Sequence, residues 1–113
     1  MNKALYTTLN VAKEHMREYM KKINMDHPLI EPLAKHLETT LDVIELIIVT
    51  TDNSNNDLLP KRWHYVRLRN LTKKLTSQPS FHFHDEQWET MCYYLKHSIK
   101  GLYAQYDIYG MNH

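Results

Sequence analysis

The sequence predicts an all-α protein folded as an antiparallel, up-and-down four-helix bundle. Apolar residues recur at alternating steps of three and four in four long segments, which is the period of an α-helix. Short stretches rich in Pro, Asn, Asp and Ser separate these segments. The chain has only 2 glycines in 113 residues, and both lie near its C-terminus. Glycine-rich phosphate loops and the Asn-Gly or Asp-Gly turns of β-hairpins are therefore absent.

We expect a single helical domain over residues 1–113, because one domain of this length can bury a core. The first helix is expected over residues 3–23. The second is expected over residues 30–50, since a proline is tolerated in the first turn of a helix and Pro32 follows a break at Pro28. In the first helix the apolar stripe is Leu5, Leu9, Ala12, Met16, Tyr19 and Ile23, and in the second it is Ile30, Leu33, Leu37, Leu41, Ile44 and Ile48.

The third helix is expected over residues 58–76 and the fourth over residues 85–109. Asp85 is expected to cap the fourth helix, because a carboxylate accepts hydrogen bonds from the free N–H groups of a first turn. Gly101 within that helix predicts a place where another helix passes close. The third helix has a wide predicted buried face made of two apolar lines: Leu59, Trp63 and Val66, and Leu68, Leu71 and Leu75.

The net charge of +1 hides a strong segregation, because residues 26–57 carry a net charge of −6 and residues 58–84 carry +6. One hypothesis is that these charges cancel each other across a groove between the second and third helices, where an acidic ridge (Glu31, Glu38, Asp42 and Glu45) would meet a basic one (Arg62, Arg69 and Lys73). The other is that the third helix faces outward and binds an anion, with stacking rings among its cations, as in surfaces that bind single-stranded nucleic acid. The candidate anion surface is Lys61, Arg62, Arg67, Arg69, Lys73 and Lys74.

Tyrosines gather in the last segment of the chain. They cannot all face one core from one helix, because Tyr93 and Tyr94 differ by about 100° around its axis. Tyrosine is enriched at protein interfaces, so some of these rings predict a partner surface, the alternative being a half-buried rim of the core. This candidate partner surface is Tyr93, Tyr94, Tyr103, Tyr106 and Tyr109.

The sequence contains no arrangement of residues that is typical of a catalytic site or a cofactor site. The chain has 8 histidines but no Glu-x-x-His, the motif of metal sites in helix bundles. His82 and His84 alternate in a loop, where they could chelate a metal or simply face water, and we expect the second. The single cysteine, Cys92, excludes an intramolecular disulfide and is expected to be buried and inert. We therefore predict no enzyme activity, no cofactor and no metal.

The expected compartment is the cytoplasm, with no membrane. One cysteine fits a reducing environment, and no signal peptide is visible at the N-terminus. The longest apolar stretch, residues 43–49, is interrupted by Glu45 and is far shorter than the ~20 residues of a membrane span.

The arrangement resembles the YppE-like family of small bacterial four-helix-bundle proteins. The residues that carry the resemblance are Pro32-Leu33-Ala34, Asn70-Leu71, Trp88 and Tyr94-Leu95. The resemblance implies a four-helix bundle and assigns no chemistry. From the residues, we expect a non-enzymatic protein-interaction or regulatory module that binds a protein partner or a second copy of itself. The alternative is nucleic-acid binding through the third helix.

Overall fold

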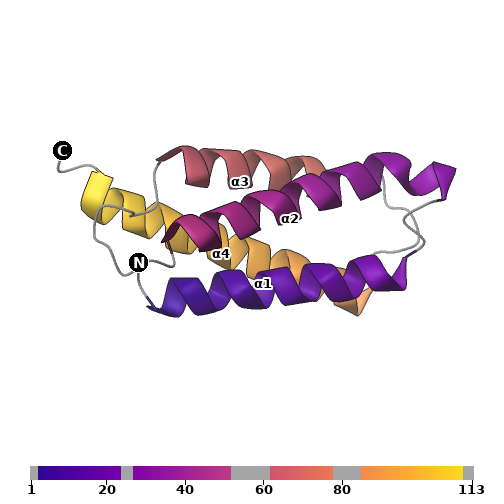
Figure 1. Cartoon of the computed structure of the whole chain (residues 1–113), viewed down its shortest axis with the longest axis horizontal. Helices are drawn as coiled ribbons and strands as arrows, with labels where there is room; N and C mark the ends of the chain where they lie inside the picture. The colour runs from indigo at the N-terminus through magenta and orange to yellow at the C-terminus, as the bar shows by residue number, and fades with distance from the viewer. Residues whose placement is uncertain (1–2, 24–26, 52–61, 78–84, 111–113) are drawn as a thin grey trace.

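A computed structural model describes residues 3–23, 27–51, 62–77 and 85–110, and the predicted all-α four-helix bundle is confirmed. Its elements are α1 (Lys3–Lys22), a short 3₁₀ turn η1 (Pro28–Ile30), α2 (Glu31–Thr51), α3 (Arg62–Thr76) and α4 (Glu86–Gly110). Each helix runs antiparallel to the one before it, as expected for an up-and-down bundle (Figure 1). Each also packs against its neighbour in sequence, and α4 closes the bundle against α1.

The helix boundaries follow from local sequence signals. The imidazole of His27 accepts a hydrogen bond from the N–H of Leu29 at 3.1 Å and caps η1, while Pro32 lies in the first turn of α2. The carboxylate of Asp85 accepts from the N–H of Trp88 at 3.0 Å, so the predicted cap of α4 is confirmed. The β-branched run at the end of α2 stays helical through Thr51.

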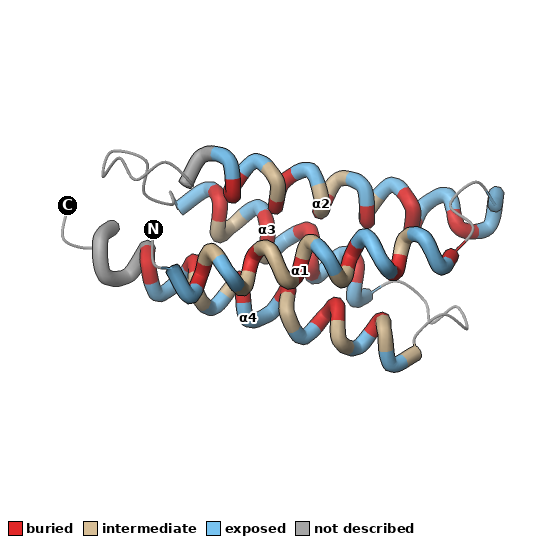
Figure 2. The backbone as a smooth tube through the Cα atoms, turned by 60° about the horizontal axis from the view of Figure 1, so that its bottom comes forward, coloured by how far each residue is buried: buried red, intermediate tan, exposed pale blue. Residues whose placement is uncertain are grey.

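The core runs along the inner faces of all four helices, where buried residues recur every three or four positions (Figure 2). The predicted stripe of α1 is buried throughout, and that of α2 is buried except for Leu41, which is half-buried. Two polar core residues bond within their own helix: the hydroxyl of Thr40 donates to the carbonyl of His36, and that of Ser98 donates to the carbonyl of Tyr94.

The buried face that the sequence predicts for α3 is partly wrong. Leu68, Leu71 and Leu75 are buried as expected, but Trp63 is 47% exposed and Val66 is only half-buried. His64 instead is fully buried. The three leucines fix the rotation of the helix, and a residue one position from Trp63 then falls in the core. Leu59 lies outside the described residues.

Gly101 lies against Leu5 of α1, in agreement with the close passage of another helix that the sequence predicts. A Cβ atom added to Gly101 would stand 2.6 Å from Cδ1 of Leu5, which is itself buried. A side chain added at Gly101 would therefore force the end of the Leu5 side chain to move.

We expect Gly101→Val to lower the free energy of unfolding by about 1–3 kcal/mol, because the added side chain overpacks against Leu5. Ala104→Val is the control at an exposed position of the same helix, where only a helix-propensity loss of roughly 0.5 kcal/mol applies; Gly101→Val instead gains helix propensity, which the overpacking has to exceed. Urea denaturation measures both. The cost at Gly101 should shrink in a Leu5→Ala background, and equal costs for the two valines would contradict a tight contact.

Candidate functional site

The tyrosines of α4 do not form one surface. Tyr94 turns toward α1, where its ring stacks on His15 with centroids 5.0 Å apart and planes 6° apart. Tyr103 turns toward α3, where it lies 5.2 Å from the ring of Tyr65. Tyr93 points outward between them. The side chains of Tyr106 and Tyr109 lie outside the described residues. The helical twist therefore divides the candidate partner surface, and interhelical packing takes up part of its area.

A continuous row of rings nevertheless crosses from α1 to α4, and we call His15, Tyr94, Tyr93 and His97 the aromatic row. Tyr93 meets Tyr94 edge-to-face, with centroids 5.2 Å apart and planes at 90°, and its centroid lies 4.3 Å from that of His97. Tyr93 is 56% exposed. Each such ring pair contributes about 0.5–1.5 kcal/mol beyond its buried area. The exposed rings are thus held in place by their neighbours.

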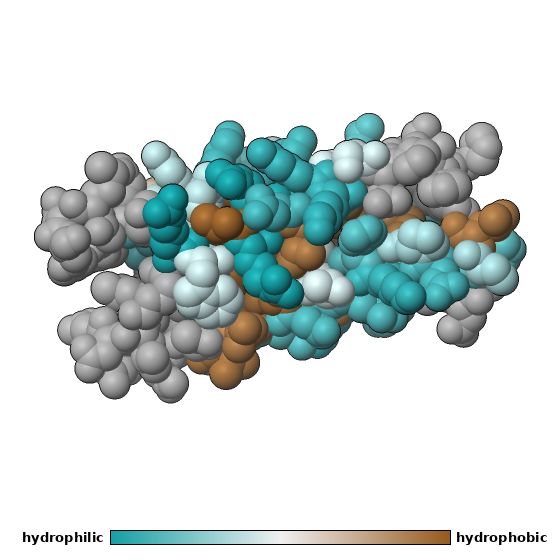
Figure 3. All heavy atoms as spheres, turned by 90° about the horizontal axis from the view of Figure 1, so that it is seen from above, coloured by the Kyte–Doolittle hydropathy of each residue, from teal (hydrophilic) through white to brown (hydrophobic). Residues whose placement is uncertain are grey.

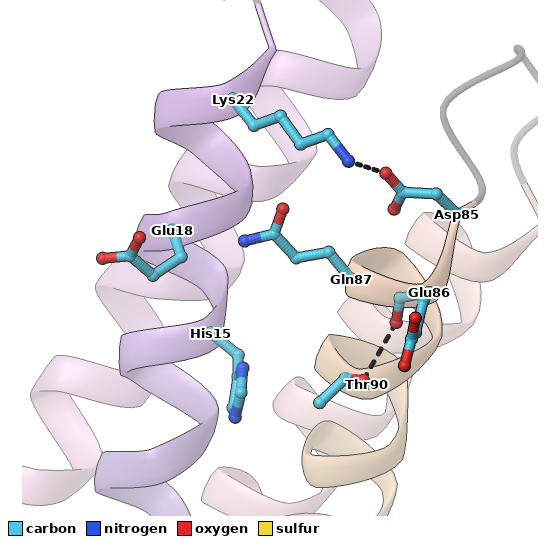
Figure 4. A pocket seen from close by; sticks show the side chains of 7 residues that line it. All are labelled: His15, Glu18, Lys22, Asp85, Glu86, Gln87 and Thr90. Carbon is cyan, nitrogen blue, oxygen red and sulfur yellow. Dashed lines mark hydrogen bonds and ion pairs between the residues drawn. The ribbon is translucent and has the colours of Figure 1, made fainter.

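Beside the aromatic row lies the α1/α4 groove, a depression of about 630 Å³. Figure 4 shows the side chains of His15 and Gln87 directed into the space between the two helices, while Glu18 points away. An ion pair between Lys22 and Asp85 spans one end. The groove is lined by His15, Glu18, Lys22, Asp85, Glu86, Gln87 and Thr90.

The candidate anion surface on α3 is also divided. Arg69 lies along its own helix: its guanidinium lies 5.3 Å from the centroid of the Tyr65 ring and donates to the Tyr65 hydroxyl at 3.4 Å. Arg62 and Lys73 are seven residues before and four after Arg69, so they lie on the same side of the helix. Arg67 and Lys74 lie on another side, together with Trp63. Lys61 lies outside the described residues.

Two members of the acidic ridge of α2, Glu45 and Glu31, form ion pairs with residues outside α3. Glu45 pairs with Arg17 of α1, which shows that this side of α2 faces α1. Glu38 lies seven residues before Glu45 and thus on the same side, while Glu31 pairs with Lys35 within α2. Within the described ranges neither Arg69 nor Lys73 forms an ion pair. The predicted cancellation between the second and third helices is therefore wrong for these residues.

Cys92 is buried, as predicted, and its thiol is poorly suited to nucleophilic chemistry. Burial raises the pKa of Cys92 from 9.0 to about 11, with Lys96 lowering it and Glu89 raising it by smaller amounts. Burial likewise raises the pKa of Tyr19 to about 12. In the described part of the chain no three His, Cys, Asp or Glu side chains gather to form a metal site. His82 and His84 lie outside it.

Comparisons with protein-family models, with curated proteins and with solved structures found no match to this chain. The resemblance to the YppE-like family therefore stays a prediction. None of the helices in the described residues has the length and apolar character needed to cross a membrane. The geometry of the chain itself is thus the basis for assigning a function.

Several site residues could not be found from composition alone. The contact between His15 and Tyr94 depends on the register of two helices far apart in the sequence. The pair Tyr93 and His97, by contrast, has the four-residue spacing of neighbours on a helix and was visible in the sequence. Trp63 and Arg67 have the same four-residue spacing, which was also visible in the sequence.

The contribution of Asp85 as the cap of α4 can be measured separately from the contribution of its ion pair with Lys22. Asp85→Ala should lower the free energy of unfolding by about 1 kcal/mol, because it removes the acceptor for the N–H of Trp88. Asp85→Asn keeps an oxygen at the cap and loses only the partly exposed pair with Lys22, so its cost should be a few tenths of a kcal/mol. Thermal denaturation of both variants measures this, and an asparagine as damaging as alanine would contradict it.

Alkaline pH should destabilise the fold through Cys92. Since the pKa of its thiol is 9.0 ordinarily and about 11 in the fold, the unfolded chain releases this proton first. The stabilisation that comes from keeping the Cys92 thiol protonated in the fold is fully present below pH 9 and is lost as the pH rises toward 11. Urea midpoints at pH 8, 9, 10 and 11 measure the loss, and Cys92→Ala should show a smaller decline than the wild type. Parallel declines in the two proteins would contradict this assignment.

Proposed function

We propose that this chain is a non-enzymatic protein-interaction module whose partner docks on the face formed by α1 and α4. The observation that carries this proposal is the aromatic row, in which a half-exposed tyrosine contacts the rings of Tyr94 and His97. Exposed rings that are already ordered lose little side-chain entropy on binding, so more of their contact energy appears as affinity.

The surroundings of the row support a docking role. Stable interfaces have a central cluster of aromatic residues and a polar rim that closes around it. Here the α1/α4 groove provides polar side chains beside the rings, among them Glu18, Gln87 and Thr90. The same arrangement offers little to a catalyst, since the thiol of Cys92 is buried and its pKa is raised. The reducing cytoplasm expected from a single cysteine is the compartment that we propose.

The partner that we propose is a second copy of this chain. In a twofold dimer the same patch meets itself, so Tyr93 and His97 of one copy would contact the same rings of the other. Ring-on-ring contacts suit such pairing, because offset and edge-to-face arrangements are both favourable. The groove residues would then surround the paired rings.

Sedimentation equilibrium at concentrations up to several hundred micromolar tests this proposal. We expect a reversible dimer in the wild type and a roughly 30-fold weaker one in Tyr93→Ser, the effect of losing about 1 kcal/mol from each of the two copies. Trp63→Ser is the matched control, because Trp63 is similarly exposed but lies on α3. A monomeric wild type that also yields no Tyr93-dependent partner in crosslinking pull-downs would contradict the proposal. So would an equal effect of the Trp63 change.

A further inference from the structure

A second surface of the bundle, along the line where α3 meets α4, has a different chemistry from the aromatic row. The rings of Tyr65 on α3 and Tyr103 on α4 mark one end of this line, with centroids 5.2 Å apart and planes tilted by 53°. Arg69 and Lys73 follow Tyr65 at steps of four, so they lie on the same side of α3. The cations of α3 that come after Tyr65 therefore run along the junction with α4.

Two lysines of α4 extend along the same line. Lys100 and Lys96 precede Tyr103 by three and seven residues, which places them on its side of α4. Because α3 and α4 are antiparallel, the rising numbers of α3 and the falling numbers of α4 run in the same direction from the tyrosine pair. Lys96 also lines a depression of about 400 Å³ together with Thr76 of α3. We call the resulting cluster the cationic seam: Arg69, Lys73, Lys96 and Lys100.

The two helices carry no acidic residue along this stretch. The sequence of α3 has no Asp or Glu between residues 62 and 76, and that of α4 has none between residues 90 and 105. Within the described part of the chain, no member of the cationic seam forms an ion pair. Arg62 and Lys74 of α3 have other interactions and are not counted in this charge. The seam therefore has a net positive charge without them.

Arg69 is a half-buried cation with no acidic partner among the described residues. Its guanidinium lies 5.3 Å from the centroid of the Tyr65 ring and donates to the Tyr65 hydroxyl at the long distance of 3.4 Å. Its Nε–H is buried and has no hydrogen-bond partner in the described ranges. A partly buried charge is screened less by salt and water than an exposed one, so it gains more from an opposite charge. A carboxylate beside Arg69 would supply that charge.

We propose that the cationic seam binds an acidic, extended segment of a partner protein. A helix rises 1.5 Å per residue, so Arg69 and Lys73 are about 6 Å apart along α3, and Lys96 and Lys100 are about 6 Å apart along α4. In an extended peptide every second side chain lies on the same face, about 7 Å from the next. Carboxylates at alternate positions of such a segment match the spacing of the cations. The seam faces α3 and not α1, so the proposal does not depend on dimer formation through the aromatic row.

Carboxylates suit this surface better than a nucleic-acid strand does. Single strands are held by aromatic rings placed among cations, on which successive bases stack. Here Tyr65 and Tyr103 lie together at one end of the seam and pack on each other. Lysine, which makes up most of the seam, acts as a point charge and needs no planar partner. Figure 3 shows the side of the bundle with α2 and α3, where hydrophilic residues predominate, so binding along α3 depends on charge more than on apolar area.

The test uses a fluorescent peptide of about ten residues in which Glu and Ser alternate. The matching peptide of Gln and Ser is its uncharged control. Fluorescence anisotropy at about 20 mM salt should show saturable binding of the acidic peptide and no binding of the control. The affinity should fall several-fold by about 150 mM salt, where the Debye length is only about 8 Å.

Variants of exposed residues locate the site. Lys73→Gln and Lys100→Gln should each weaken binding about twofold to fivefold, the range expected for one exposed ion pair. Lys73→Glu combined with Lys100→Glu should weaken it more than about tenfold, because the new carboxylates repel the peptide. Arg67→Gln is the matched control, since Arg67 is exposed on α3 but lies about 160° around the helix from Arg69. Its affinity should stay within about 1.5-fold of the wild type.

Four results would overturn the proposal. One is the absence of acidic-peptide binding by the wild type at low salt. Another is an equal loss in Arg67→Gln and Lys100→Gln, which would mean a diffuse attraction to the whole of α3. Oligothymidylate of the same charge that binds more tightly than the peptide would assign the seam to nucleic acid. Salt-dependent self-association that the double glutamate variant abolishes would assign it to a second copy. Circular dichroism of each variant verifies that the helices are intact.

Discussion

The packing of α1 against α4 is the constraint on which the rest of the structure depends. Three contacts fix the register of this pair along its length: Leu5 against Gly101, His15 on Tyr94, and Lys22 with Asp85. The residue numbers rise in one helix as they fall in the other, which is the signature of an antiparallel pair. The absent side chain of Gly101 leaves room for the side chain of Leu5. With this register set, the aromatic row and the α1/α4 groove follow as consequences.

Much of the fold could be predicted because burial leaves a regular mark on the sequence. The stripe of α1 and the cap at Asp85 are local features, and local features need no knowledge of neighbouring helices. The contacts made by the outward sides of the helices could not be predicted in this way. Which neighbour an exposed side of a helix meets depends on the rotation of every helix in the bundle, and spacing alone does not set it. The pairing of Glu45 with Arg17 is such a case, since the sequence alone allowed Glu45 to face either α1 or α3.

The segregation of charge acquires a different meaning in the structure. Opposite net charges in neighbouring segments suggest mutual neutralisation, but the two helices turn their charged sides in different directions. On α2, Glu45 meets a cation of α1, and Glu31 pairs with Lys35 of its own helix. On α3, Arg69 lies against an aromatic ring. Exposed ion pairs contribute only about 0–1 kcal/mol each, so folding does not require the charges of α3 to be cancelled internally.

The exposure of Trp63 is a consequence of packing elsewhere on α3. Turning the helix by about 100° would exchange Trp63 and His64, placing the indole inside and the imidazole outside. The same turn would bring Leu68, Leu71 and Leu75 out of the core, where burial of each is worth about 1.5–3 kcal/mol. Three leucines outweigh one tryptophan, so the helix keeps its present rotation. The core thus holds an aromatic ring at the surface.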